Sequence, residues 1–232
     1  MDVVASIKDG FDCDGQNVRP AASPRAMRRL HWLVKLAADR ALALALLAFL
    51  LPALVLLVAL IVCVSFGWPF FAHERVGRDG RTFRCLKLRS MRPNAAEMLR
   101  HILETDPAAA REWESNRKLR DDPRIIPLGR FIRATSLDEL PQLFNILRGE
   151  MSFVGPRPIT SAELVRYGAG ASHYLAVTPG LTGLWQVSGR SDIGYAERVA
   201  LDVDYVETWS LYGDLKILLR TPRAVLAMAG AC

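Results

Sequence analysis

The chain has 232 residues, of which 51% are hydrophobic and 23% are charged, and its formal net charge is +6. These values exclude an intrinsically disordered chain and suit one domain with its own core, or a small domain joined to a membrane element. A basic balance fits nucleic acid, an anionic membrane face or phosphorylated substrates. The four cysteines form no CxxC or cysteine–histidine cluster, so neither a zinc site nor a disulfide framework is indicated.

The first long apolar run divides the N-terminal region. Residues 1–28 contain glycine and proline without apolar periodicity, and they predict a flexible tail. Residues 29–67 predict a membrane helix, because no residue in the range 41–66 is charged. At about 1.5 Å per residue, such a run is long enough for a hydrocarbon core about 30 Å thick.

Pro52 lies near the middle of the apolar run, where a proline removes a helical hydrogen bond and bends the helix. Arginine and lysine flank the run on both sides, and the positive-inside rule places such residues in the cytoplasm. A helix that enters the membrane, bends at Pro52 and returns would keep both flanks inside. A single-pass anchor with one dominant flank is the alternative.

Residues 68–232 predict a mostly helical domain of the α+β class with one small β-hairpin. Alternating apolar residues around Asp79-Gly80 place the hairpin in 68–92. Apolar periodicity predicts helices, of which the last two are amphipathic, over residues 94–118, 136–148, 160–168, 195–208 and 214–228. Residues 179–189, which include Trp185, predict a glycine-rich loop.

The adjacent acids Asp138 and Glu139 have two interpretations. Ser136 and Glu139 have the spacing of a capping box, which would make the acids part of a helix start. Alternatively, free N–H groups at a helix start suit phosphate, and two carboxylates suit Mg²⁺. Neighbours on a helix point about 100° apart, so the two acids are expected to have different roles.

Several basic residues also have both a functional and a structural interpretation. Arg157 lies between two prolines that restrain its backbone, and Arg190 ends the glycine-rich loop, so each suits either phosphate binding or a solvated turn. Lys87 and Arg89 follow the apolar run and suit phosphate or lipid headgroups. The four histidines are scattered and indicate no metal triad.

Taken together and in order, these motifs resemble the bacterial sugar transferases, also called small monotopic phosphoglycosyl transferases, over roughly residues 35–222. The likeness is greatest to exopolysaccharide-initiating members of the ExoY type. It rests on Glu74-Arg75-Val76-Gly77, Lys87-Leu88-Arg89-Ser90-Met91, Ser136-Leu137-Asp138-Glu139-Leu140-Pro141, Gly155-Pro156-Arg157-Pro158, Pro179-Gly180-Leu181-Thr182-Gly183 and Gly189-Arg190.

The resemblance implies a re-entrant membrane helix, broken near a proline, that enters one leaflet from the cytoplasmic face of the bacterial inner membrane. The break reads Leu51-Pro52 here, where many members have Ser-Pro. Loss of that serine leaves its stabilising contact in doubt but not the bend at the proline.

The resemblance also implies a Mg²⁺-dependent reaction in two steps. Asp138 attacks the β-phosphate of a UDP-sugar, with galactose the first expectation and glucose the second, and UMP leaves. Undecaprenyl phosphate then takes the sugar phosphate, and Glu139 assists the metal or the acceptor. Asp138 and Glu139 are the expected metal ligands. The residues expected to bind substrate are Lys87, Arg89, Arg133, Arg157, Arg190, Asp202 and Asp214.

Other functions differ in what they require of the sequence. A non-catalytic membrane scaffold for polysaccharide assembly would tolerate changes at Asp138 and Arg157. Nucleic-acid binding rests on the net charge alone, since no basic recognition helix or aromatic RNA-binding motif is present, and it is not expected. The expected partners are the nucleotide sugar, the polyprenyl phosphate and the bilayer. A homodimer is compatible with the sequence, which does not fix the oligomeric state.

Overall fold

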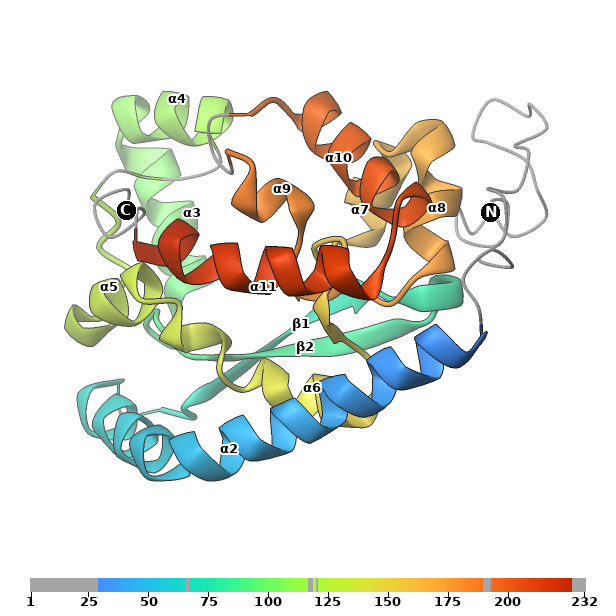
Figure 1. The fold of residues 1–232 in the computed structure, drawn as a ribbon. Coiled ribbons are helices and arrows are strands. Elements are labelled where there is room, and N and C mark those ends of the chain that lie inside the picture. The colour runs from blue at the N-terminus through green and yellow to red at the C-terminus, as the bar shows by residue number, and fades with distance from the viewer. Residues whose placement is uncertain (1–28, 66, 117–118, 120, 190–192, 227–232) are drawn as a thin grey trace. The chain divides into compact units, whose positions relative to one another are not determined.

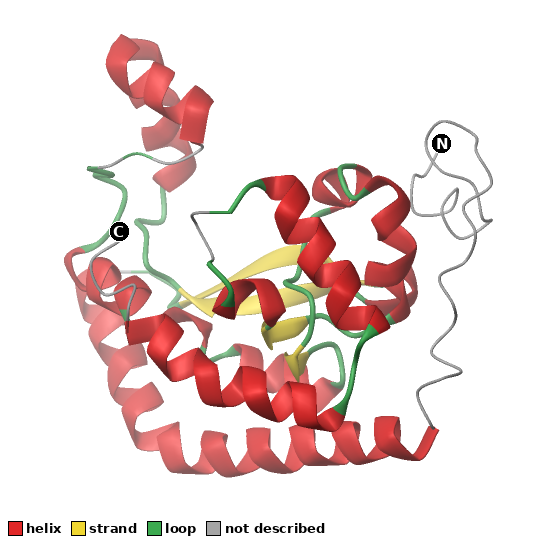
Figure 2. Ribbon diagram, turned by 45° about the horizontal axis from the view of Figure 1, so that its top comes forward, coloured by secondary structure: helices red, strands yellow, loops and turns green. Residues whose placement is uncertain are grey.

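The computed structural model of the chain describes residues 29–65, 67–116, 119, 121–189 and 193–226. Helices predominate, and the described strands form two small two-stranded sheets (Figures 1 and 2). The chain packs as two compact units. Unit 1 comprises the described residues of Met1–Phe49, Ala72–Leu86 and Pro141–Ala224, and unit 2 those of Leu50–Phe71, Lys87–Leu140 and Val225–Cys232. The predicted helical majority and hairpin are confirmed.

The long apolar run forms a single helix, α2, from Arg29 to Ser65 (Figure 1). By length and composition its Leu30–Ser65 segment is able to cross a membrane, and only 11% of its most apolar window is buried. Phe49 is 79% exposed and Leu51 is 49% exposed. Exposed apolar side chains along a whole helix suit a lipid environment better than water.

Pro52 lies within α2, where it leaves the carbonyl of Ala48 without its helical N–H partner. The division between the two units also falls here, since residues up to Phe49 belong to unit 1 and those from Leu50 to unit 2. The re-entrant bend stays a prediction.

The predicted hairpin is formed by β1 (Phe70–Val76) and β2 (Thr82–Leu88), joined by the 3-10 turn η2 (Arg78–Gly80). Asp79 and Gly80 both have positive φ, 57° and 73°, as tight hairpin turns require. The Gly77 N–H donates to the Arg81 carbonyl at 2.8 Å and closes the turn.

Unit 1 contains a second sheet that the sequence did not predict. Strand β3 (Ser152–Val154) pairs in parallel with β4 (Gly180–Thr182). A Cβ on Gly180 would lie 2.1 Å from the Gly155 nitrogen, so only glycine permits this approach. The prediction of a loop over 179–189 was therefore wrong, because this segment forms β4 and the short helix α9 (Leu184–Val187).

Two hydrophobic clusters form the core of unit 1. One gathers side chains from β2, from α6 (Gln142–Arg148), from α10 (Tyr195–Glu207) and from α11 (Leu211–Leu226). The other joins Val76, Ile159, Tyr167 and Tyr174 around α7 (Ser161–Val165), η4 (Gly168–Gly170) and α8 (Ala171–Ala176). The two predicted C-terminal helices are confirmed as α10 and α11, while the predicted helix 160–168 is shorter.

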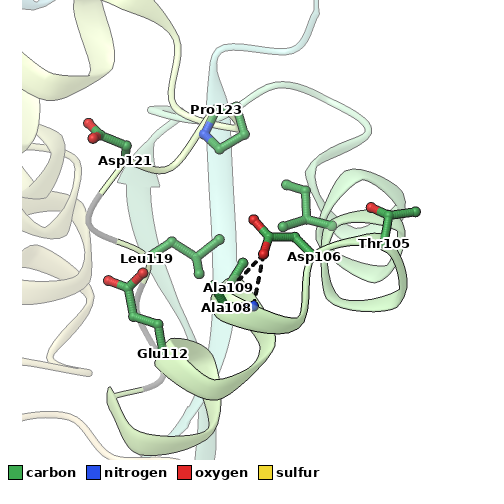
Figure 3. A pocket seen from close by; sticks show the side chains of 9 residues that line it. Thr105, Asp106, Ala108, Ala109, Glu112, Leu119, Asp121 and Pro123 are labelled. Carbon is green, nitrogen blue, oxygen red and sulfur yellow. Dashed lines mark hydrogen bonds between the residues drawn. The ribbon is translucent and has the colours of Figure 1, made fainter.

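Unit 2 contains α3 (Ala95–Thr105), α4 (Pro107–Asn116), α5 (Pro127–Ala134) and the 3-10 turn η3 (Leu137–Glu139). The single helix predicted over 94–118 is divided at Asp106, whose carboxylate accepts from the Ala108 and Ala109 N–H groups at 2.8 and 3.1 Å (Figure 3). Pro107 suits the first position of the new helix because that N–H would have no partner. A cavity of about 580 Å³ lies beside this junction and contains none of the predicted site residues.

Candidate active site

The acidic pair lies in a tight turn of unit 2. Helix α5 ends at Ala134, Ser136 adopts a left-handed conformation (φ 57°, ψ 18°), and η3 follows at once. The Glu139 N–H donates to the Ser136 carbonyl at 3.1 Å. A left-handed non-glycine residue is uncommon, and such strain gathers at functional sites.

The capping-box interpretation of Ser136 was wrong. The Ser136 side chain makes no capping hydrogen bond, and its backbone is left-handed where an N-cap is normally extended. The helix predicted over 136–148 is instead the three-residue turn η3 followed by α6 from Gln142. Asp138 is therefore presented by a short turn and gains little from a helix dipole, which needs aligned peptides over several turns.

Lys87, at the end of β2, meets both acids. Its Nζ lies 2.8 Å from Glu139 Oε1 and 3.4 Å from Asp138 Oδ2. The Asp138 side chain is 12% exposed, and those of Lys87 and Glu139 are each 29% exposed. Lys87 therefore lies beside the acidic pair in a partly exposed cluster, and its expected role in binding substrate stays a prediction.

The environment of Asp138 perturbs its ionisation. Burial raises the pKa of the Asp138 carboxyl above its usual range, and the neighbouring Glu139 charge adds to the rise. The positive charges of Lys87 and Arg133 lower the same pKa but do not cancel the effect of burial. A carboxylate held this way is more basic, and hence more nucleophilic, than one in water.

The other predicted basic residues of unit 2 differ in their relation to this cluster. Arg133, on the last turn of α5, is close enough for its charge to act on Asp138 and also on Asp122. The Arg89 side chain is half-buried, and its backbone N–H donates to the Pro69 carbonyl at 2.7 Å. The charge of Arg133 therefore acts on Asp138, and the substrate roles of Arg133 and Arg89 stay predictions.

The acidic pair fits Mg²⁺ bound jointly with a substrate. Two carboxylate oxygens from adjacent residues both approach the Lys87 ammonium, so the two side chains point to the same side of the turn. Mg²⁺ takes one or two carboxylates and completes its shell with water and substrate phosphate oxygens. Within the described part of the chain, no group of three His, Cys, Asp or Glu side chains is placed to hold a metal.

The remaining predicted residues belong to unit 1. Arg157 is exposed, with its guanidinium 6.0 Å from the centroid of the Trp185 ring. The Asp202 carboxylate accepts from the Tyr167 hydroxyl at 2.7 Å, and that of Asp214 accepts from Lys35 at 2.6 Å. Arg190 lies outside the described residues. These contacts give both aspartates structural partners, and their substrate roles stay predictions.

Sequence reasoning missed two basic residues of unit 1. Lys35, read as part of a basic flank of the membrane run, is 4% exposed and also donates to the Val154 carbonyl at 3.1 Å. Arg198, on α10, stacks on Trp185 with its guanidinium 4.5 Å from the ring centroid. The only sequence signal for Lys35 is Asp39 one turn later, and Arg198 gives none.

The chain thus combines a helix long and apolar enough to cross a membrane with an acidic pair held against a lysine. The chain belongs to the bacterial sugar transferase family, whose model matches residues 30–228.

Named relatives are similar over most of the chain. A UDP-galactose-lipid carrier transferase of Erwinia amylovora is 54% identical over 82% of the chain and 39% of its own length. An undecaprenyl-phosphate galactose phosphotransferase of Salmonella typhimurium is 54% identical over 71% of the chain and 35% of its own length. The exopolysaccharide production protein ExoY of Sinorhizobium fredii is 46% identical over 89% of the chain and 91% of its own length. The chain thus spans little more than a third of the first two relatives and nearly all of the third.

Proposed function

We propose that the protein transfers a sugar 1-phosphate from a UDP-sugar to undecaprenyl phosphate, as the first membrane step of exopolysaccharide synthesis. The convergence of Asp138 and Glu139 on Lys87, within the matched family segment, carries the proposal. Galactose is the first candidate for the sugar, because two similar proteins are named for galactose transfer to a lipid carrier. Glucose is the second, since a relative from Caulobacter vibrioides is named for UDP-glucose.

In the first step, a carboxylate oxygen of Asp138 attacks the β-phosphorus of the donor. The bond between that phosphorus and the oxygen bridging to the α-phosphate breaks, so UMP leaves and the sugar phosphate stays on Asp138 as an acyl phosphate. The raised pKa of Asp138 supports this role because it reflects a carboxylate poorly stabilised by solvent. Lys87 is placed to offset the negative charge of the phosphates.

In the second step, a phosphate oxygen of undecaprenyl phosphate attacks the same phosphorus. The acyl phosphate bond breaks, Asp138 returns to a carboxylate, and a polyprenyl diphosphate sugar is released. Asp138 and Glu139 would hold Mg²⁺ together with the donor diphosphate, where the ion supplies charge neutralisation. Glu139, paired with Lys87 at 2.8 Å, is placed to orient that ammonium toward the phosphates.

For the membrane, we propose that α2 bends at Pro52 and returns to the cytoplasmic face, leaving the active site at the headgroup level of the inner membrane. Support comes from the missing hydrogen bond at Pro52 and the basic residues on both flanks. Cysteine labelling from each side of the membrane tests this bend. Residues before 25 and after 75 should both label from the cytoplasm, and periplasmic labelling of the first region would overturn the re-entrant helix.

The chemical proposal is tested by Asp138→Asn, which removes the nucleophilic oxygen with little change in size. UMP release from a UDP-sugar should fall at least about a thousandfold, while membrane insertion is unchanged. Asp79→Asn is the matched control, because Asp79 lies in the exposed hairpin turn where asparagine is well tolerated. A panel of UDP-sugars assayed with the wild-type protein identifies the donor.

Substantial UMP release by purified Asp138→Asn would remove Asp138 from the nucleophile role. A wild-type protein without any Mg²⁺-dependent turnover would favour the alternative of a non-catalytic scaffold.

A further inference from the structure

Two arginines of unit 1 share one tryptophan. The guanidinium carbon of Arg198 lies 4.5 Å from the centroid of the Trp185 ring, and that of Arg157 lies 6.0 Å from it. Trp185 is only 8% exposed, so its ring is a fixed platform in the core of the unit. Arg157 is restrained by the prolines on either side of it. Two positive charges are thus gathered around one rigid surface.

Three nitrogen atoms of this cluster lack partners within the described part of the chain. The Nε and Nη2 atoms of Arg198 and the Nε1 atom of Trp185 are buried without a hydrogen bond. Neither Arg157 nor Arg198 takes part in any ion pair among the described residues. Buried donors are nearly always satisfied in folded proteins, and those on a charged group are the costliest to leave unpaired.

Two acids, Glu163 and Asp202, interact with the charge of Arg198 but do not supply these hydrogen bonds. Glu163 pairs with Arg75 at 3.1 Å and accepts from the Thr160 N–H. Asp202 lies one turn after Arg198, but its carboxylate accepts from the Tyr167 hydroxyl through Oδ2 at 2.7 Å. Its Oδ1 is itself buried without a partner, so it does not accept from Arg198. The missing partner of Arg198 is therefore an acceptor from outside the described residues, and an anion with several oxygens would also offset the charge of Arg157.

We propose that Arg157, Trp185 and Arg198 form a binding site for a phosphoryl group, in which Arg198 donates to the phosphate oxygens. A planar guanidinium matches a phosphate with two parallel N–H···O bonds, and stacking on Trp185 fixes its plane in advance. Which phosphate fills the site, that of the nucleotide donor or that of the lipid acceptor, rests on the proposed function. The presence of the site does not.

Arg166 offers a control, since it is a stacked arginine of the same unit without buried, unpaired nitrogen atoms. Its guanidinium also stacks on an aromatic ring of unit 1, 3.8 Å from the centroid of Tyr195, but its side chain is exposed. Its nitrogen atoms are not among the buried groups without a partner. A purely structural role for stacked arginines would give the two residues similar effects.

Isothermal titration of the full-length protein in detergent tests the proposal with three probes, namely UDP, farnesyl phosphate and inorganic phosphate. Arg198→Gln should raise the Kd of at least one probe by about tenfold or more, whereas Arg166→Gln should leave it within about twofold. If the variant loses affinity for UDP alone, the phosphate that fills the site is that of the nucleotide donor. If it loses affinity for farnesyl phosphate alone, the phosphate is that of the lipid acceptor. Arg198→Lys retains the charge but not the paired N–H groups, so its Kd for the affected probe should lie between those of wild type and Arg198→Gln.

Wild-type affinity of Arg198→Gln for all three probes would overturn the proposal, as would equal losses in Arg198→Gln and Arg166→Gln. If Arg198→Gln does not fold, wild-type affinity of Arg198→Lys overturns it instead. These binding results are independent of turnover. Wild-type affinity of Arg198→Gln for all three probes together with an inactive Asp138→Asn would reject this site but not the reaction. Weakened binding of at least one probe by Arg198→Gln together with an active Asp138→Asn would reject the reaction but not the site.

Discussion

Two lysine–carboxylate clusters, one in each unit, are built differently. In unit 1, Lys35 is 4% exposed and donates to Asp214 at 2.6 Å and to the Val154 carbonyl. The Asp214 carboxylate also accepts from the Tyr205 hydroxyl and the Trp209 indole, at 2.9 and 3.2 Å. In unit 2, Lys87 is 29% exposed and faces Asp138 at the longer distance of 3.4 Å.

This difference sets a structural pair apart from the pair that we propose takes part in the reaction. The carboxylate of Asp214 has a donor on each side, so it is stabilised by its hydrogen bonds and has little capacity left for a substrate. Among the described residues, the buried Asp138 side chain accepts one long hydrogen bond, from Lys87 at 3.4 Å. Its carboxylate is therefore less saturated with donors than that of Asp214, as the proposed nucleophile role requires. The two pairs contain the same residue types and differ in hydrogen-bond saturation and in exposure.

The largest expected effect is on stability at Lys35. Lys35→Met leaves the buried Asp214 charge without its cation, which typically costs about 3–5 kcal/mol of unfolding free energy. Lys216→Met, at an exposed lysine of α11, should change it by less than about 0.5 kcal/mol. Denaturant unfolding in detergent measures both. A Lys35→Met protein as stable as wild type would show that the buried pair is not structural.

The next effect is on catalysis at Lys87. Lys87→Met should lower sugar phosphate transfer by about a hundred- to a thousandfold, because a positive charge beside the phosphates is lost. Its unfolding free energy should change by no more than about 1 kcal/mol, since the pair is partly exposed. A Lys87→Met protein that unfolds as readily as Lys35→Met would abolish the distinction between the two clusters.

A third carboxyl, Asp202, is buried like Asp214 but has no lysine. Burial raises the pKa of Asp202 to about 6, although the Tyr167 hydrogen bond and the Arg198 charge lower it. Between its unfolded value of 3.8 and about 6, the folded protein binds more protons than the unfolded chain. Stability due to this group is therefore full below that window, declines as the pH rises through it, and stays low above it.

Asp202→Asn removes this decline because the amide does not ionise, and Tyr167 can still donate to its oxygen. Above pH 6 the variant should gain about 1–3 kcal/mol over wild type, and below pH 4 the two should converge. Thermal unfolding of both proteins between pH 4 and pH 7 measures how this difference in stability depends on pH. Parallel curves for the two proteins would mean that Asp202 ionises in the folded protein without cost.

Local patterns predicted the elements that depend on local chemistry. The apolar run gave α2, the Asp79-Gly80 turn gave the hairpin, and helical periodicity gave α10 and α11. The sheet of β3 and β4 was missed because its strands have three residues each and pair across a long stretch of chain. No periodicity can be read from strands that short.

For the site, motif order identified Asp138, Glu139 and Lys87, and the structure brings them together. Their local geometry was not predictable, because the left-handed Ser136 depends on how the chain reverses after α5. Arg198 was missed for a similar reason. Its stacking on Trp185 joins two helices, and neither sequence carries a sign of the other.

The smallest expected changes in stability concern two helix starts. A capping box was predicted at Ser136, and the structure contains one at Thr160 instead. Thr160 accepts from the Glu163 N–H at 3.2 Å, and the Glu163 carboxylate accepts from the Thr160 N–H at 2.8 Å. Thr160→Ala should therefore cost about 1 kcal/mol. Ser136→Gly removes no cap and relieves a left-handed conformation, so it should leave stability unchanged or raise it by up to about 1 kcal/mol. Denaturant midpoints at equal slope measure both, and a loss at Ser136→Gly equal to that at Thr160→Ala would restore a stabilising role for the serine side chain.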